Sequence, residues 1–187
     1  MSTLKVDTIL KRTGTGTITL GQSGDTLAIP SGVTIANSGT ATGFGTNSPI
    51  FLAYHDGDRD VDNGTETKVI AGTEIIDTDS AYDTSTGRFT VPNGKAGYYK
   101  FTAVFTHRDT SNAQTGSGFA FYKNGSKNPF QHSSSQFTGH RNDTRSYSHI
   151  FNLAVADYIE FYAFTEGSTN YTKIERPTVM GYKLITW

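Results

Sequence analysis

The aromatic residues are distributed very unevenly along this chain of 187 residues. Only one of them, Phe44, lies within the first 50 positions, and all the other Phe, Tyr and Trp residues follow it. A segment without large apolar side chains cannot bury enough surface to fold around a core of its own. The sequence therefore predicts an N-terminal extension over residues 1–45, a hinge at 46–50 and a globular domain over residues 51–187.

The composition indicates the structural class of both parts. The chain has 20 Gly, 5 Pro and no Cys, only 18% of its residues are charged, and Thr and Ser are abundant. Thr favours half-exposed strands, and Ser and Gly favour turns, so this balance indicates β structure. The lack of Cys excludes a disulfide framework, a thiol nucleophile and a Cys-based zinc site.

The net charge of −1 and the distribution of charged and apolar residues argue against nucleic acid and membrane partners. No basic stripe offers a surface to nucleic acid, and no apolar stretch approaches the roughly 20 residues that span a bilayer. The first residues also lack the apolar region of a signal peptide. We therefore expect synthesis in a cytoplasm without export, no nucleic acid partner and no insertion into a membrane.

A weak repeat occupies the N-terminal part. Ser-Gly pairs begin at positions 23, 31 and 38, among short units in which two apolar residues flank a third residue. This spacing predicts alternating strands and turns, after a short attachment strand at Leu4–Leu10. Such thin strands can form a shaft with a shared interior when three chains intertwine. The candidate interface residues are Ile18, Leu20, Leu27, Ile29 and Ile35. A flexible Gly/Ser/Thr linker is the alternative.

From residue 50 onward, short apolar runs alternate with turn signals such as Asn63-Gly64 and Asn124-Gly125. No segment of ten or more residues has helical periodicity. We expect an all-β domain of about ten strands in two packed sheets. The strands are expected at Phe51–Tyr54, Lys68–Ile70, Glu74–Ile76, Arg88–Val91, Tyr99–Thr106, Phe119–Tyr122, Ser146–Leu153, Tyr158–Phe164 and Val179–Ile185.

Two of these strands differ in their side-chain pattern. Tyr99–Thr106 carries its large apolar residues on one face, which is typical of a sandwich strand with one face in the core. In Tyr158–Phe164 both faces are largely apolar, so both should be covered. A neighbouring subunit could cover the second face, which makes Tyr158, Tyr162 and Phe164 candidate trimer-interface residues. A loop of the same chain is the alternative.

The segment Tyr82–Phe105 resembles the signature of the C1q/TNF-like superfamily, and specifically of the globular C1q domain. The matching residues are Asp83, Gly87, Phe89, Thr90, Pro92, Gly97, Tyr99 and Phe101. Looser matches occur at Phe119–Gly125, Phe151–Phe161 and Val179–Leu184. The resemblance covers about residues 50–187, and it implies a ten-stranded jelly roll that forms tight homotrimers.

The segment Thr13–Gly45 is similar to short shaft segments of bacteriophage tail-fibre-like proteins. Such proteins are trimers with a slender β shaft and a globular tip. This second resemblance implies a location on the virion surface. It also agrees with the first, because both resemblances imply three-fold assembly.

The residues capable of metal or acid–base chemistry form no recognised motif. Five His residues occur without a metalloprotease, serine-hydrolase or phosphate-loop motif, so we expect no enzymatic activity. The acidic run His55–Glu66 places Asp56, Asp58, Asp60 and Asp62 at alternate positions. These carboxylates could bind Ca²⁺, which prefers oxygen ligands. A solvated loop is the alternative, and no other cofactor is expected.

Three polar segments are candidate receptor loops, at His107–Gly116, His132–Arg145 and Thr165–Thr172. Rigid sandwiches carry recognition on such loops, and amides, Arg and aromatic rings suit sugars. The candidate contact residues are His107, Arg108, Asn112, Gln114, His132, Gln136, Phe137, His140, Arg141, Asn142, Arg145, Asn170 and Tyr171. Ordinary loops without a ligand are the alternative.

Together these features predict a trimeric phage protein of the tail-fibre type, with a C1q-like knob that adheres to the host surface. Its partners would be further copies of itself, other virion proteins at the N-terminus, and a host glycan or protein. A capsid decoration or head-fibre protein with the same fold is the main alternative. A free C1q-like lectin and a fibre-borne glycan hydrolase are weaker ones.

Overall fold

The computed structural model describes residues 9, 16–36, 38, 47–109, 114–129, 135–136, 142–167 and 171–185. The chain divides into two compact units, Met1–Phe44 and Gly45–Trp187. The described part of the chain is all-β, and none of it forms a helix that could cross a membrane.

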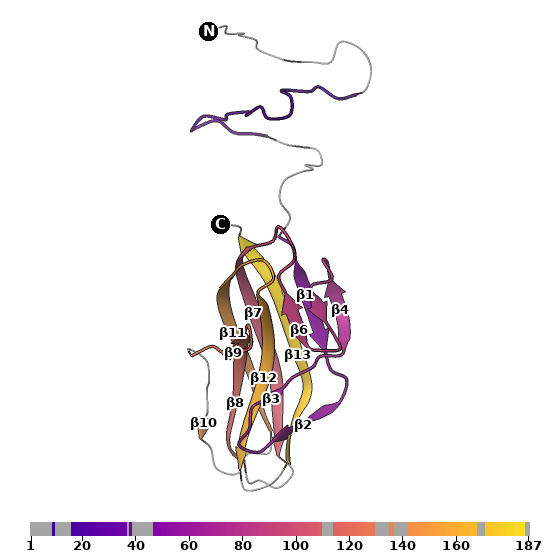
Figure 1. Cartoon of the computed structure of the whole chain (residues 1–187), viewed down its shortest axis with the longest axis vertical. Coiled ribbons are helices and arrows are strands. Elements are labelled where there is room, and N and C mark those ends of the chain that lie inside the picture. Colours follow the sequence, from indigo (N-terminus) through magenta and orange to yellow (C-terminus); the bar gives the residue numbers. More distant parts are fainter. Residues whose placement is uncertain are drawn as a thin grey trace. The chain divides into compact units, whose positions relative to one another are not determined.

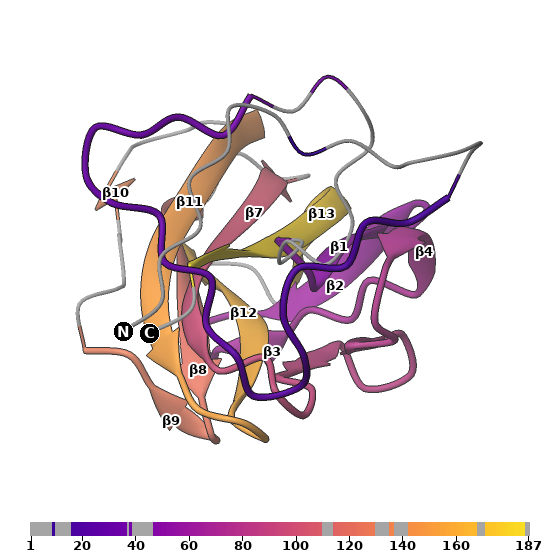
Figure 2. The same ribbon diagram turned by 90° about the horizontal axis from the view of Figure 1, so that it is seen from above.

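The second unit is a sandwich of two antiparallel sheets (Figures 1 and 2). Sheet A has the order β11-β7-β13-β1-β4, with β2 also paired to β13, and sheet B has the order β10-β8-β12-β6-β5, with β3 on β12 and β9 on β8. The strands of sheet A are β1 (Ile50–Tyr54), β2 (Asp58–Asp62), β4 (Thr73–Asp77), β7 (Gly97–Asp109), β11 (Asn142–Leu153) and β13 (Tyr171–Ile185). Those of sheet B are β3 (Thr67–Lys68), β5 (Tyr82–Asp83), β6 (Arg88–Thr90), β8 (Gln114–Lys123), β9 (Ser126–Lys127), β10 (Ser135–Gln136) and β12 (Tyr158–Gly167).

Each of the nine predicted strands corresponds to a strand of the sandwich, but several have different bounds. The predicted and observed bounds differ most in β13, which begins at Tyr171 instead of Val179. Its N-terminal half contains polar residues such as Lys173 and Glu175, which gave no apolar strand signal. β2 was not predicted as a strand, because it contains a single apolar residue, Val61, which is fully buried. Three of the four two-residue strands in the described part of the chain, β5, β9 and β10, were missed as well.

Aromatic side chains from both sheets fill the space between them. Phe51 and Phe101 of sheet A and Phe89 and Phe161 of sheet B have no exposed surface. The ring centroids of Phe89 and Phe101 lie 5.1 Å apart with their planes nearly perpendicular, a favourable edge-to-face arrangement. The predicted inward face of β7 is confirmed, since Tyr99, Phe101, Ala103 and Phe105 are all buried.

In the first unit, the Ser-Gly pairs at positions 23 and 31 form turns. The Asp25 N–H donates to the Gln22 carbonyl at 3.0 Å, and the Val33 N–H donates to the Pro30 carbonyl at 3.2 Å. Gly24 and Gly32 take positive φ angles of 93° and 84°, which glycine adopts without strain. Gly39 of the third pair and most of Leu4–Leu10 lie outside the described residues.

The apolar residues between these turns are exposed in the single chain. Residues 16–36 contain no assigned strand, so the strands expected there are not formed in one copy. The exposed fractions of Ile18, Leu20, Leu27, Ile29 and Ile35 are 45%, 61%, 67%, 44% and 63%. The described residues of the first unit thus have two turns of the predicted repeat but form no core within a single chain.

Candidate functional site

The strand ends next to the three predicted receptor loops meet at one end of the sandwich. In sheet A, Arg108 of β7 is paired with Asn142 of β11 and lies beside Lys173 of β13. In sheet B, Gln114 at the start of β8 is paired with Gly167 at the end of β12. We call this the distal end.

The chain enters the domain at the opposite end. Ile50 at the start of β1 is paired with Tyr182 near the end of β13, and the Lys183 N–H donates to the Pro49 carbonyl at 3.1 Å. The antiparallel strands thus separate the point where the N-terminal extension joins the domain from the polar distal end (Figure 1).

The structure places the candidate receptor residues in three groups. Six of them lie outside the described residues: Asn112, His132, Phe137, His140, Arg141 and Asn170. Four lie in strands, where the structure describes their backbone: Gln114, Gln136, Asn142 and Tyr171. The side chains of His107, Arg108 and Arg145 are described.

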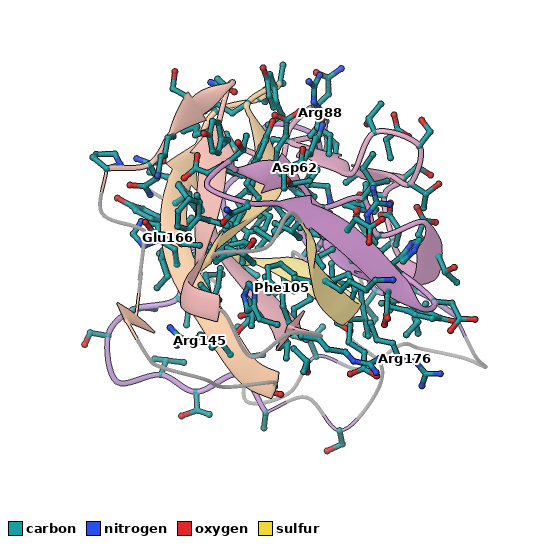
Figure 3. All side chains as sticks on the ribbon, turned by 90° about the horizontal axis from the view of Figure 1, so that it is seen from below. Asp62, Arg88, Phe105, Arg145, Glu166 and Arg176 are labelled. Atoms are coloured by element: carbon teal, nitrogen blue, oxygen red, sulfur yellow. The ribbon has the colours of Figure 1, made fainter. Side chains whose placement is uncertain are left out.

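His107 does not lie in a loop, so its prediction as a receptor contact was wrong. Strand β7 continues to Asp109, and the alternation of its side chains places His107 on the inner face after Phe105. Its side chain has no exposed surface, and its ring packs edge-on at 6.3 Å from the ring of Phe105. Figure 3 shows Phe105 in the interior and Arg145 on a neighbouring strand. Arg108 points outward and Arg145 is half-buried, so both remain candidates.

Part of the acidic run is a strand, and its interpretation as a loop was wrong for Asp58–Asp62. The carboxylates face basic side chains: Asp58 lies 3.6 Å from Arg108, Asp60 lies 3.7 Å from Lys173, and Asp56 lies 3.9 Å from Arg176. Such long, exposed ion pairs contribute little stability. Within the described residues, no three acidic or His side chains form a group that could hold a metal ion.

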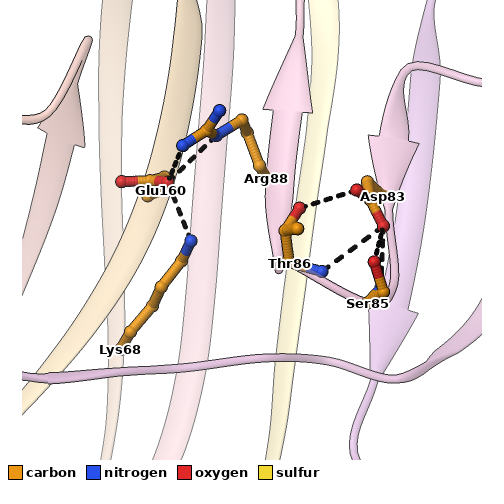
Figure 4. Close-up of polar contacts among 6 residues, drawn as sticks. All are labelled: Lys68, Asp83, Ser85, Thr86, Arg88 and Glu160. Atoms are coloured by element: carbon orange, nitrogen blue, oxygen red, sulfur yellow. Dashed lines mark hydrogen bonds and ion pairs between the residues drawn. The ribbon is translucent and has the colours of Figure 1, made fainter.

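The outer face of sheet B contains a buried carboxylate. Glu160 of β12 is only 6% exposed in its side chain, and its Oε1 accepts hydrogen bonds from Lys68 Nζ at 2.8 Å and from Arg88 Nε and Nη2 at 3.0 and 2.8 Å (Figure 4). The Arg88 guanidinium also lies 3.9 Å above the ring of Tyr158. The ring of Tyr162 lies 4.1 Å from that of Tyr122.

These contacts bear on the question of what covers the second face of β12. Tyr158 and Tyr162 contact side chains of neighbouring strands of the same sheet and are half-buried, so the subunit interface on this face stays a prediction. Phe164, further along β12, is half-buried and lines a cavity that is described below.

Burial and hydrogen bonding act on Glu160 in opposite directions. Desolvation raises the pKa of Glu160, but the hydrogen bonds and charges of Lys68 and Arg88 outweigh it, so the pKa lies below its usual value. The carboxylate therefore stabilises the fold above the unfolded-state pKa of about 4.3, and this contribution is lost as the pH falls through the folded-state pKa.

We expect Glu160→Gln to lower the free energy of unfolding by about 1–2 kcal/mol at pH 7, since Lys68 and Arg88 are partly exposed and water can replace part of the lost interaction. The difference from wild type should shrink as the pH falls below about 4.3 and should vanish once the pH is below the folded-state pKa of Glu160. Urea denaturation over a series of pH values measures it. Asp60→Asn, which removes an exposed pair, is the control and should change stability by less than about 0.5 kcal/mol. A pH-independent loss would contradict the role of the charge.

The outer face of sheet A is apolar where β1 and β13 cross its centre. The strand register places Leu52 of β1 between Ile76 of β4 and Met180 of β13, and it places Ile50 beside Tyr182. These side chains are half-buried or exposed, and Ile76 is 41% exposed. We call Ile50, Leu52, Ile76, Met180 and Tyr182 the apolar face. Beside it, β7 and β11 are polar, with Thr102 and Ser148 hydroxyls hydrogen-bonded at 2.8 Å.

No protein-family model matches the chain, and no curated protein sequence matches it. Solved structures do match. The globular domain of the zebrafish complement 1qA protein has a TM-score of 0.52 and 12% identity, over 75% of this chain and 100% of that one. The PRD1 vertex protein P5 has a TM-score of 0.56 and 12% identity, with the same coverage of both chains. The domain therefore has the C1q/TNF-like jelly-roll fold that the sequence resemblance implied.

Proposed function

We propose that this chain is a non-enzymatic structural protein of a bacteriophage virion, a homotrimer of the tail-fibre type that attaches the particle to its host. The first unit would anchor the protein to other virion proteins, and the jelly-roll knob would bind a glycan of the host surface. The observation that carries the proposal is the arrangement of the knob. The chain enters at one end, and the strand ends that flank the polar candidate loops meet at the other.

Two apolar surfaces support self-association. The described residues 16–36 of the first unit expose their apolar side chains and form no core in one chain. The apolar face of the knob would be solvent-exposed in a monomer, although the other face of the same sheet already supplies the core. Exposed apolar patches of this kind mark interfaces. A homotrimer would cover both surfaces.

A capsid decoration or head-fibre protein is the second candidate, because one of the matching folds is that of a phage vertex protein. In that case the protein would stabilise the shell through its N-terminal contacts and adhere only weakly. Immunogold labelling of particles with antibodies against the knob distinguishes the two candidates by the location of the label on the head or on the tail.

Attachment is tested with the purified full chain. Light scattering should give three times the monomer mass of 20.3 kDa. The fluorescently labelled trimer should adsorb to host cells and should compete with phage adsorption. A monomeric mass would contradict the assembly, and a trimer that fails to adsorb to host cells or to compete with phage would contradict the attachment function.

A further inference from the structure

A cavity of about 370 Å³ opens on the outer face of sheet B, in its distal half. Its walls include Phe164 and Glu166 of β12, Gly118 of β8, Lys127 of β9, and Gly64 and Glu66 from the connection between β2 and β3. Its volume is near the lower end of the roughly 300–1,000 Å³ of small-ligand pockets, which suits one sugar ring.

The strand register explains why there is space at this position. Phe164 of β12 is paired with Gly118 of β8, and Glu166 is paired with Gly116. The two glycines on β8 have no side chains, so the outer surface of the sheet is recessed at this point. The ring of Phe164 borders the recess. The sheet thus forms a floor next to an aromatic wall.

The opposite wall is fixed by hydrogen bonds. The Gly64 N–H donates to the Thr165 carbonyl at 2.8 Å, which attaches the β2–β3 connection to β12. The Glu66 carboxylate accepts hydrogen bonds from the Tyr122 hydroxyl and from Lys127 Nζ. Desolvation and then the bond to Glu66 raise the pKa of Tyr122 to about 12, so its hydroxyl remains a donor at neutral pH. The cavity is thus preorganised, which lowers the entropy cost of binding.

The charges around the cavity select among ligands. The charged side chains in the described lining are Glu66, Glu166 and Lys127, and Lys127 is bonded to Glu66. A lining with two acidic side chains is a poorer site for sulfated, phosphorylated or carboxylated sugars than for neutral ones. Carboxylates accept hydrogen bonds from sugar hydroxyls, and the face of Phe164 can pack against the apolar face of a pyranose ring.

We infer that this cavity binds one uncharged pyranose unit of a host-surface glycan. The inference rests on the proposed attachment function and moves its binding site from the distal loops to the side of the knob. The cavity lies on the outer face of sheet B and the apolar face on that of sheet A, so contacts made on the apolar face do not themselves fill the cavity of the same copy. Several weak sites on one particle then bind with high avidity.

The test uses the full-length trimer on an array of neutral and acidic glycans, followed by binding constants on the neutral glycans that are bound. Phe164→Ala should weaken this binding about tenfold, since it removes the aromatic wall. Glu166→Gln should weaken it severalfold. Glu175→Gln, which changes a carboxylate of sheet A away from the cavity, is the matched control and should leave binding unchanged.

Several results would overturn the inference. These are binding to acidic glycans alone, binding to no glycan, or neutral-glycan binding that Phe164→Ala and Glu166→Gln leave intact while circular dichroism shows folded variants. The two proposals fail separately. If wild type and Phe164→Ala adsorb equally to host cells, the cavity is not the binding site, but the proposed attachment function still holds. If the protein binds neutral glycans through Phe164 but does not adsorb to host cells, the attachment function is wrong, but the proposed sugar site in the cavity still holds.

Discussion

Gly181→Ala should destabilise the knob by about 2–3 kcal/mol, although it adds only one methyl group. A Cβ atom at Gly181 would lie 2.5 Å from Cδ1 of Phe101 and 2.7 Å from Cε1 of Phe51. Both rings are fully buried and packed against Phe89 and Phe161. The rings can make room only by moving the centre of the core, so the cost is one of overpacking.

Thermal unfolding of the second unit measures this cost, and a loss of 2–3 kcal/mol corresponds to a Tm decrease of roughly 4–12 °C. Gly72→Ala is the matched control, because no atom lies within 4 Å of a Cβ at Gly72. That change should leave the Tm unaltered or raise it slightly, since alanine restricts the unfolded chain. Equal Tm values for Gly181→Ala and wild type would show that the aromatic core adjusts easily.

The fold was largely predictable because the sandwich strands carry local signals. In Tyr99–Phe105 every second residue is a buried apolar one, and the residues between them are Lys, Thr and Val. Asn124-Gly125 marks the turn after β8, where Asn124 and Gly125 take the positive φ angles of 52° and 77° that such a turn requires. Strand β2 had no such signal. Its single apolar residue, Val61, cannot establish a period, and its pairing with β13 is a long-range contact that the local sequence does not encode.

The sites were less predictable, because they depend on which strands become neighbours. Gly118 and Phe164 are far apart in the sequence, and only the pairing of β8 with β12 places one opposite the other. The apolar face had a usable signal, since Ile50–Tyr54 is apolar on both faces, as Tyr158–Phe164 is. In Tyr158–Phe164 the same pattern predicts a covered outer face, and there Tyr158 and Tyr162 contact Arg88 and Tyr122 of neighbouring strands and stay half-buried.

Met180→Glu should prevent the proposed trimerisation of the knob without unfolding it. Met180 lies at the centre of the apolar face, between Leu52 and Thr102 in the strand register, and its neighbours Val179 and Gly181 point into the core instead. In the monomer a Glu side chain at this position is solvated. In a trimer each copy would bury a carboxylate against apolar residues, at a cost of several kcal/mol per site.

Light scattering of the second unit, residues 45–187, over a range of concentrations measures this effect without a contribution from the first unit. Leu52→Lys is a second variant on the same face and should act in the same way, so the result does not depend on one substitution. Thr90→Glu introduces the same charge at an exposed position of sheet B and should leave the trimer intact. Circular dichroism confirms folding of each variant. Folded Met180→Glu and Leu52→Lys variants that remain trimers would place the subunit contact outside the apolar face, because no carboxylate or ammonium can be buried there without a partner at negligible cost.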